Sequence, residues 1–273
     1  MKTVCVITGG GSGMGLAAAK YMPKDKIIVV TGRTMKKLEK AVKELEDAGY
    51  EAYAKTCDTS DRLQVRELAE YAASLGEIKN VINAAGLSPA MANPEQLIRV
   101  NALGTVYINQ EFSKLMKKGS VIVDVSSNSA YMIPDFLASD KVFSLAETDE
   151  KLFLKKILSL PNKLKGYKAS GLAYGLSKKF VIRYASKCAY QYGEKGIRVC
   201  SLSPGLVATD MGKLEAEEGG ALLETTAEKR MGKPEELGYA LATLADERNG
   251  YLAGVDVLID GGSINGKKFI KFK

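Results

Sequence analysis

Short apolar runs that alternate with helical patterns constrain the fold of this chain more than any other feature. The seven runs hold three to five residues each, and most of them are rich in β-branched residues. Parallel strands buried on both faces of a sheet have this composition. The runs are Val4–Thr8, Ile27–Thr31, Tyr53–Cys57, Val81–Asn83, Val121–Val125, Val199–Leu202 and Val255–Ile259.

The segments between these runs have helical periodicity. The clearest one starts after Thr34, a candidate N-cap, carries Leu38, Val42 and Leu45 at helical spacing, and ends at Gly49. Strands that alternate with helices pair in parallel through right-handed crossovers. The sequence therefore predicts a Rossmann-like, doubly wound α/β fold of three layers, with residues 1–273 in a single domain.

One stretch breaks the alternation. Residues 131–171 mix acidic and apolar side chains where only a loop is expected. A structureless loop of this length is improbable inside a compact domain. We therefore predict a helical insertion over 131–171.

Composition excludes several classes of function. The chain has no histidine, which removes Ser-His-Asp triads, Cys-His pairs and nearly all catalytic zinc sites. Its four cysteines lack metal-ligand spacing, so we expect no metal and a reduced, cytoplasmic location. No apolar run approaches the roughly 18 residues that span a bilayer, and we expect neither a signal peptide nor a membrane partner.

The formal charge of +7 does not indicate a nucleic-acid partner. The lysines are spread over helical stretches and over a tail that starts at Lys267. The chain has no zinc-finger spacing and no basic block with interleaved aromatic residues. A basic balance also suits a protein that holds a polyanionic dinucleotide.

A glycine-rich loop directly follows the first run. Its sequence is Thr8-Gly9-Gly10-Gly11-Ser12-Gly13-Met14-Gly15, and a strong helix former follows it. Glycines permit a tight turn and close backbone approach, while the helix N-terminus presents free N–H groups to a pyrophosphate. The candidate cofactor-binding residues in this loop are Gly9, Ser12, Gly13, Met14 and Gly15.

The spacing Thr-Gly-x-x-x-Gly-x-Gly resembles that of the short-chain dehydrogenase/reductase family. The resemblance implies an oxidoreductase that uses a nicotinamide dinucleotide on a small-molecule alcohol or ketone. It also implies a homodimer or homotetramer. Other motifs along the chain match further positions of the family.

Arg33 indicates which nicotinamide cofactor is used. It lies after the second run, where dinucleotide-binding folds commonly place an acidic residue on the ribose 2′-hydroxyl. A guanidinium can instead accept a 2′-phosphate through charge-assisted hydrogen bonds. We favour NADP(H), with NAD(H) as the alternative if Arg33 is merely a solvated cation.

Three further motifs match cofactor-binding positions of the family. Asp58, after the third run, matches the residue that contacts the adenine. The segment 83–86 resembles the family's Asn-Asn-Ala-Gly. Alanine replaces the second asparagine at position 84, so only the backbone role of that position is kept. The segment 204–209 resembles the one that holds the nicotinamide carboxamide. The candidates are Asp58, Asn83, Ala84, Gly86, Pro204, Gly205, Val207 and Thr209.

Tyr174 and Lys178 form the candidate acid/base pair. Residues four apart share a helix face, and an ammonium group beside a tyrosine lowers its pKa from about 10 toward neutrality. Tyr174 is the only tyrosine with a lysine four residues later, and the pair precedes a Gly-Ile-Arg-Val run as it does in the family. Both residues would also contact the cofactor. The alternative is an amphipathic helix that packs Tyr174 and solvates Lys178.

Ser127 and Asn101 complete the candidate catalytic set. Ser127 is the second serine after the fifth run, where the family carries the serine that hydrogen-bonds the substrate oxygen. Ser126 is the fallback. Asn101 matches the helix asparagine that, in relatives, holds a water molecule linking the lysine to solvent.

The chain departs from the family pattern between Ser127 and Tyr174. They are 47 positions apart, far more than in most relatives. The bacterial 3α-hydroxysteroid dehydrogenase/carbonyl reductase type carries such an insertion, which implies a bulky hydrophobic substrate such as a hydroxysteroid or bile acid. Met211–Met231 lies where relatives have a substrate lid, with an ordinary exposed helix as the alternative, and we expect a solvated tail from Lys267.

Other functions remain open at this point. The chain could reduce other small carbonyl or polyol substrates, or it could be a dinucleotide-sensing protein that has lost the chemistry. An enoyl reductase of the same fold would place its lysine seven residues after the tyrosine, where this chain has Val181.

Overall fold

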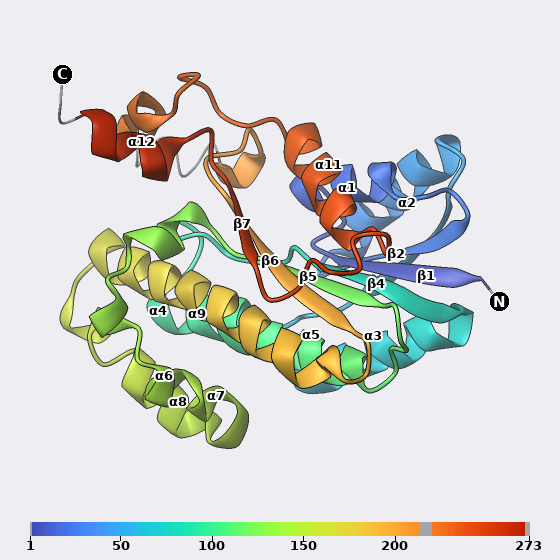
Figure 1. Ribbon diagram of the computed structural model, residues 1–273, viewed down its shortest axis with the longest axis horizontal. Coiled ribbons are helices and arrows are strands. Elements are labelled where there is room, and N and C mark those ends of the chain that lie inside the picture. The colour runs from blue at the N-terminus through green and yellow to red at the C-terminus, as the bar shows by residue number, and fades with distance from the viewer. Residues whose placement is uncertain (1, 213–219, 271–273) are drawn as a thin grey trace.

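A seven-stranded parallel sheet forms the centre of the computed structural model, which describes residues 2–212 and 220–270 (Figure 1). Each predicted run forms one of its strands, and the largest difference is at β4, which begins at Glu77 rather than Val81. The strands are β1 (Thr3–Thr8), β2 (Lys26–Gly32), β3 (Glu51–Thr56), β4 (Glu77–Asn83), β5 (Val121–Val125), β6 (Arg198–Pro204) and β7 (Asp256–Ile259).

The strand order is β3-β2-β1-β4-β5-β6-β7, so the direction of the chain across the sheet reverses between β1 and β4. In doubly wound sheets, ligands bind in the crevice outside the carboxyl ends of the strands at such a reversal. The predicted Rossmann-like fold is therefore confirmed, and its topology points to the ends of β1 and β4 as the place for a site.

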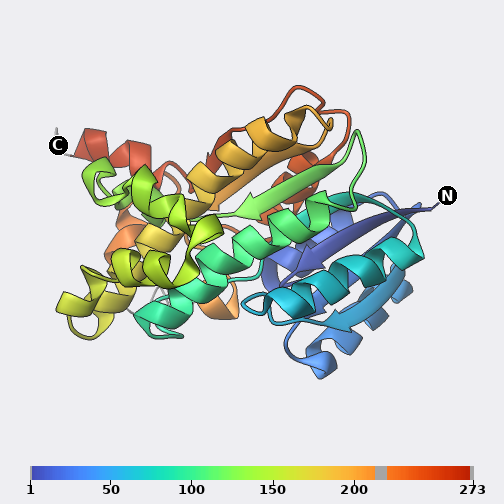
Figure 2. The same cartoon turned by 90° about the horizontal axis from the view of Figure 1, so that it is seen from below.

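Helices cover both faces of the sheet. Along β1, Val4 and Val6 pack into one hydrophobic cluster, whereas Cys5 and Ile7 pack into the other, as the two-residue period of a strand requires. One face carries α3 (Arg62–Leu75), α5 (Gly104–Ser113) and α9 (Tyr167–Gly193), and the other carries α1 (Gly13–Tyr21), α2 (Met35–Asp47) and α11 (Pro234–Ala245) (Figures 1 and 2).

Helix α2 follows its predicted boundaries. Thr34 occupies the N-cap, although its hydroxyl makes no capping hydrogen bond, and Gly49 has a φ of +85° just after the helix. Leu38 and Leu45 are buried as expected, and Ala41 is buried with them. The helix therefore packs one apolar stripe on the sheet and exposes its lysines.

The predicted helical segment at 131–171 consists of short helices. They lie beside α9 (Figure 2). An aromatic cluster joins them to this helix, in which the ring of Phe180 lies 5.2 Å from that of Phe143 and 5.5 Å from that of Phe153. Helix α9 already begins at Tyr167, so the end of the predicted segment belongs to the helix that carries Tyr174. The short helices are η2 (Asn128–Met132), η3 (Asp135–Leu137), α6 (Asp140–Phe143), α7 (Leu145–Thr148), α8 (Glu150–Ile157) and η4 (Pro161–Lys163).

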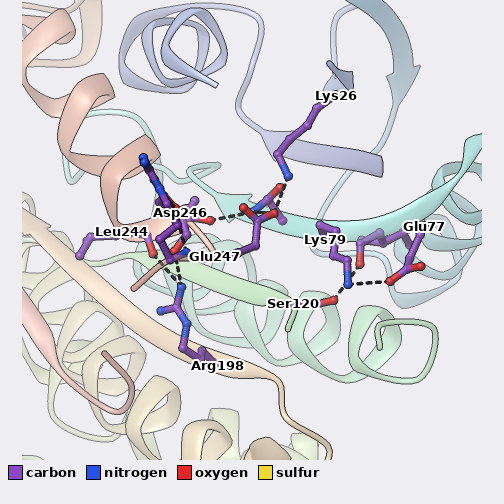
Figure 3. Close-up of polar contacts among 12 residues, drawn as sticks. Lys26, Glu77, Lys79, Ser120, Arg198, Leu244, Asp246 and Glu247 are labelled. Atoms are coloured by element: carbon purple, nitrogen blue, oxygen red, sulfur yellow. Dashed lines mark hydrogen bonds and ion pairs between the residues drawn. The ribbon is translucent and has the colours of Figure 1, made fainter. Parts of the chain in front are cut away.

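A polar cluster closes the amino-terminal edge of the sheet (Figure 3). The Arg198 guanidinium donates to the carbonyl oxygens of Leu244, at 3.4 Å, and Asp246, at 2.8 Å. Lys26 forms an ion pair with Glu247 beside them. The last carbonyl groups of a helix lack partners within it. This cluster therefore anchors the end of α11 on the side of the sheet away from the strands' carboxyl ends.

The remaining helices border the carboxyl edge of the sheet or follow β7. They are α4 (Pro94–Leu97), the π-helix η1 (Ile98–Leu103), η5 (Gly220–Thr225) and α12 (Ser263–Ile270). Among residues 2–212 and 220–270, no helix combines the length and the hydropathy that crossing a bilayer requires.

Candidate active site

A cavity of about 490 Å³ lies at the carboxyl ends of the strands, where the strand order reverses. Its walls contain every candidate site residue predicted from the sequence except Asn83 and Asn101, which are buried close behind them. The structure therefore brings together residues that lie as far apart in the sequence as Gly9 and Thr209.

The glycine-rich loop forms one wall of the cavity. Gly9 and Gly13 have φ values of +66° and +56°, which side chains rarely tolerate. A Cβ atom on Gly15 would lie 2.6 Å from the carbonyl oxygen of Gly9. Ser12 caps α1 without a side-chain hydrogen bond, and the first turn of α1 has no acidic residue. The loop thus leaves backbone N–H groups for an anionic ligand, and it fits a pyrophosphate.

Arg33 and Asp58 lie at the end of the cavity formed by β2 and β3. The Arg33 side chain is exposed at the first position after β2. Asp58 Oδ1 accepts hydrogen bonds from the backbone N–H and the hydroxyl of Ser60, at 2.9 and 2.7 Å. These bonds shape the turn after β3, so Asp58 reaches the cavity from a fixed position.

Asn83 lies behind the wall and acts on it through hydrogen bonds. The Thr8 hydroxyl donates to Asn83 Oδ1 at 2.9 Å, and the same oxygen of Thr8 accepts from the backbone N–H of Ala85 at 2.9 Å. These contacts join the ends of β1 and β4. Asn83 therefore holds the segment 84–86 in place from inside the core.

Tyr174 and Lys178 lie side by side on α9. Lys178 Nζ is 5.8 Å from the centroid of the Tyr174 ring and donates to the Val125 carbonyl at 2.9 Å. A Cβ atom on Gly86 would lie 3.4 Å from that Nζ. The ammonium group is thus buried in a narrow space between α9, β5 and the loop after β4, next to a phenol ring that also lines the cavity.

The two serines after β5 differ in their hydrogen bonds. Ser126 Oγ donates to the Lys178 carbonyl at 2.8 Å, which fixes α9 to the end of β5. Ser127 Oγ accepts from the Ser129 backbone at 3.2 Å and is 3.5 Å from Asn128 Oδ1. Because a bond of 3.5 Å is weak, the Ser127 hydroxyl is the one that can turn toward a ligand.

Asn101 lies in the π-helix η1, with its side chain bonded within the protein. Its Oδ1 accepts from the Leu87 backbone N–H at 2.9 Å, and its Nδ2 donates to the Leu87 carbonyl at 3.0 Å. The Nδ2 group also lies 3.2 Å from Ser177 Oγ. Asn101 thus positions the loop after β4 against α9. Its role in holding a water molecule stays a prediction.

Several cavity residues were not singled out in the sequence. Most of them adjoin the motifs at strand ends, which is the signal that could have found them, whereas Val100 lies beside Asn101 in η1 and Pro234 begins α11. They include Gly32, Cys57, Thr59, Ala85, Leu87, Val100, Val125, Ala208, Asp210 and Pro234. The start of the segment Met211–Met231, predicted as a lid, lines the cavity. Its residues 213–219 lie outside the described residues, and so do residues 271–273 of the predicted tail.

Two protein-family models match the chain. Residues 3–138 match a model described as short chain dehydrogenase, and residues 158–263 match one described as Enoyl-(Acyl carrier protein) reductase. The first match contains Ser127, and the second contains Tyr174 and Lys178. The unmatched residues between the two models fall in the segment of short helices after β5.

Similarity to individual proteins extends over nearly the whole chain. A short-chain dehydrogenase/reductase of Alternaria brassicicola is 28% identical over 268 residues, with 96% of each chain covered. The 7α-hydroxysteroid dehydrogenase of Escherichia coli is 23% identical over 271 residues, which cover 95% of this chain and 93% of that protein. A solved short chain dehydrogenase of Burkholderia cenocepacia in complex with NADP has the same fold, with a TM-score of 0.76, 22% identity, and coverage of 95% and 96%.

Proposed function

The chain belongs to the short-chain dehydrogenase/reductase family, and from that premise we propose that it is an NADP(H)-dependent oxidoreductase that interconverts a secondary alcohol and a ketone. The observation that carries the proposal is the buried ammonium of Lys178 beside the Tyr174 ring, with the Ser127 hydroxyl on the same cavity. A binding protein without chemistry has no need of this arrangement.

The walls of the cavity fit a nicotinamide dinucleotide. The turn at Gly15 has no room for a side chain, so the pyrophosphate can approach the N-terminus of α1. Arg33 would hold the 2′-phosphate, and the segment 204–209 would border the nicotinamide. When bound, the cofactor supplies or accepts the hydride.

The side chains of the chain itself handle the proton and orient the substrate. Ser127 Oγ would donate a hydrogen bond to the substrate oxygen and stabilise negative charge as it develops. Tyr174 Oη would give its proton to that oxygen during reduction and accept a proton during oxidation. The Lys178 ammonium would stabilise the phenolate that results.

A bulky hydrophobic substrate, such as a hydroxysteroid or bile acid, is our proposal for the substrate class. Large apolar side chains are exposed on three segments that adjoin or carry cavity-lining residues in the chain: Met91 after β4, Met132 in η2, and Tyr167 in the first turn of α9, at 45%, 45% and 47% exposure. Apolar surface of this kind binds ligands that bury large apolar areas. The relative that is a 7α-hydroxysteroid dehydrogenase supports the same class.

A substrate panel tests this proposal. Hydroxysteroids, bile acids, small ketones and polyols would be assayed with NADPH or NADP⁺ by the absorbance of the reduced cofactor. We expect the steroids and bile acids to have the highest kcat/KM. Turnover of small carbonyls or polyols alone would contradict the proposed substrate class. Binding of NADPH without turnover of any compound would contradict the proposal that the chain is an enzyme.

The Arg33→Ala variant tests the cofactor preference. Loss of charge-assisted hydrogen bonds to the 2′-phosphate is expected to raise the Kd for NADPH about 10- to 100-fold and to leave the Kd for NADH unchanged. Fluorescence titration measures both constants. Lys40→Ala, an exposed change of equal charge on α2, serves as the control. An equal effect of Arg33→Ala on both cofactors would rule out the 2′-phosphate contact.

The description of the second family model raises enoyl reduction as another activity. Lysine in that class lies seven residues after the tyrosine, and here that position is Val181, which is fully buried in α9. Lys178 instead lies next to the Tyr174 ring. We therefore propose carbonyl and alcohol chemistry.

A further inference from the structure

A buried carboxyl group lies behind the cavity, at Asp124 of β5. Its side chain is fully buried, and Ser127 follows three residues later. Asn83 Nδ2 donates to Oδ1 at 2.9 Å, and Asn109 Nδ2 lies 3.1 Å from Oδ1 and 2.9 Å from Oδ2. A buried carboxylate without donors is strongly destabilising. These two neutral amides, from β4 and α5, therefore allow an anion to exist in the core.

The same carboxylate fixes the orientation of Asn83. Because a carboxylate only accepts hydrogen bonds, Asn83 turns its Nδ2 group toward Asp124, and its Oδ1 faces Thr8. Thr8 in turn accepts from the backbone N–H of Ala85, which lines the cavity. A continuous chain of hydrogen bonds thus runs from Asp124 to the cavity wall.

Lys178 is the charged group beside this carboxyl, because its Nζ donates at 2.9 Å to the carbonyl of Val125, the residue after Asp124 in β5. Burial raises the pKa of Asp124 to about 6, and the two amide hydrogen bonds and the Lys178 charge oppose that rise. The other titratable groups that face it are Cys188 of α9 and Cys200 of β6, whose thiol pKa values burial raises to about 12. Both thiols are therefore neutral at pH 7, and the Lys178 charge is the one that favours the ionised form of Asp124.

We infer that Asp124 is a positioning residue for the reaction proposed above: its buried carboxylate balances the Lys178 ammonium and holds the loop beside it. A negative charge at this point opposes the loss of a proton from Tyr174 and from Lys178 alike. Tyr174 and Lys178 are close enough to titrate as a coupled pair. When the Asp124 charge is removed, the Lys178 charge is no longer balanced and stabilises the Tyr174 phenolate more strongly. Tyr174 therefore ionises at a lower pH.

The Asp124→Asn variant tests this inference because it removes the charge and keeps the shape of the side chain. The ionisation of Tyr174 would be followed by the ultraviolet absorbance of tyrosinate, as the difference between each protein and the same protein with Tyr174→Phe. We expect the midpoint to fall by about one pH unit. The titration needs no turnover, so it gives a result even if the proposed activity is wrong.

Two further variants keep the test decisive. Glu111→Gln removes another buried carboxylate, on α5, whose charge is already paired with Arg62 and Lys114, and it should leave the midpoint unchanged. Asp124→Ser replaces this test if Asp124→Asn does not fold. Its side chain is smaller and neutral, its hydroxyl can still accept a hydrogen bond from Asn83, and it should give the same shift of the midpoint. An unchanged midpoint in both Asp124 variants, or an equal shift in Glu111→Gln, would overturn the inference.

Discussion

Replacement of Tyr174 by phenylalanine is expected to lower kcat by about 10²- to 10⁴-fold, the usual contribution of a positioned general acid. The change removes one oxygen atom and leaves the ring in its place beside Lys178. Cofactor affinity should stay near that of the wild type, because the glycine-rich loop and Arg33 are untouched. Steady-state kinetics and NADPH fluorescence titration measure the two properties separately.

Tyr190→Phe provides the matched control for this prediction. Tyr190 lies on the same helix, α9, and its side chain is 90% exposed. Its hydroxyl should therefore have no effect on turnover. Full activity in Tyr174→Phe would mean that the proton comes from another group, and the mechanism proposed for this cavity would be wrong.

Replacement of Phe180 by alanine is expected to lower the free energy of unfolding by about 3–5 kcal/mol. Phe180 is 1% exposed and joins α9 to the short helices after β5, with its ring 5.2 Å from Phe143, 5.5 Å from Phe153 and stacked on Tyr184 at 5.3 Å. The substitution leaves a cavity at the centre of this cluster, and the lost contacts come from two separate parts of the chain. Urea unfolding followed by circular dichroism measures the effect.

Phe136→Ala tests whether burial is the cause. Phe136 lies in η3, in the same helical segment, and its side chain is 84% exposed. We expect a change in stability of no more than about 0.5 kcal/mol. Similar losses in Phe180→Ala and Phe136→Ala would show that the aromatic cluster does not bind the segment to α9.

Much of the fold could be read from the sequence because it depends on local pattern. A run such as Val121–Val125 has its residues on two faces of a strand whatever surrounds it, and the glycines from Gly9 to Gly15 can make a turn that other residues cannot. The spacing of Tyr174 and Lys178 places them on one helix face before any tertiary contact forms. The strands, the loop and this pair were therefore predicted correctly in position.

The start of α9 was less accessible to sequence analysis. Residues 167–171 read Tyr-Lys-Ala-Ser-Gly and carry no periodic apolar pattern of their own, so only packing makes them the first turns of the long helix. Ser170, for example, donates to the Ala92 carbonyl in the loop after β4. Contacts between segments so distant in sequence cannot be predicted from periodicity.

The sequence by itself determined that this chain forms a doubly wound sheet with a dinucleotide-type loop and a tyrosine and lysine on one helix face. Those features follow from the spacing of neighbouring residues. Tertiary structure decided that the Ser126 hydroxyl is bonded to α9 whereas the Ser127 hydroxyl has only a weak donor contact, and that Asp124 is buried near Lys178. Such differences arise where β5 meets α5 and α9, because burial and charge pairing depend on how separate elements pack.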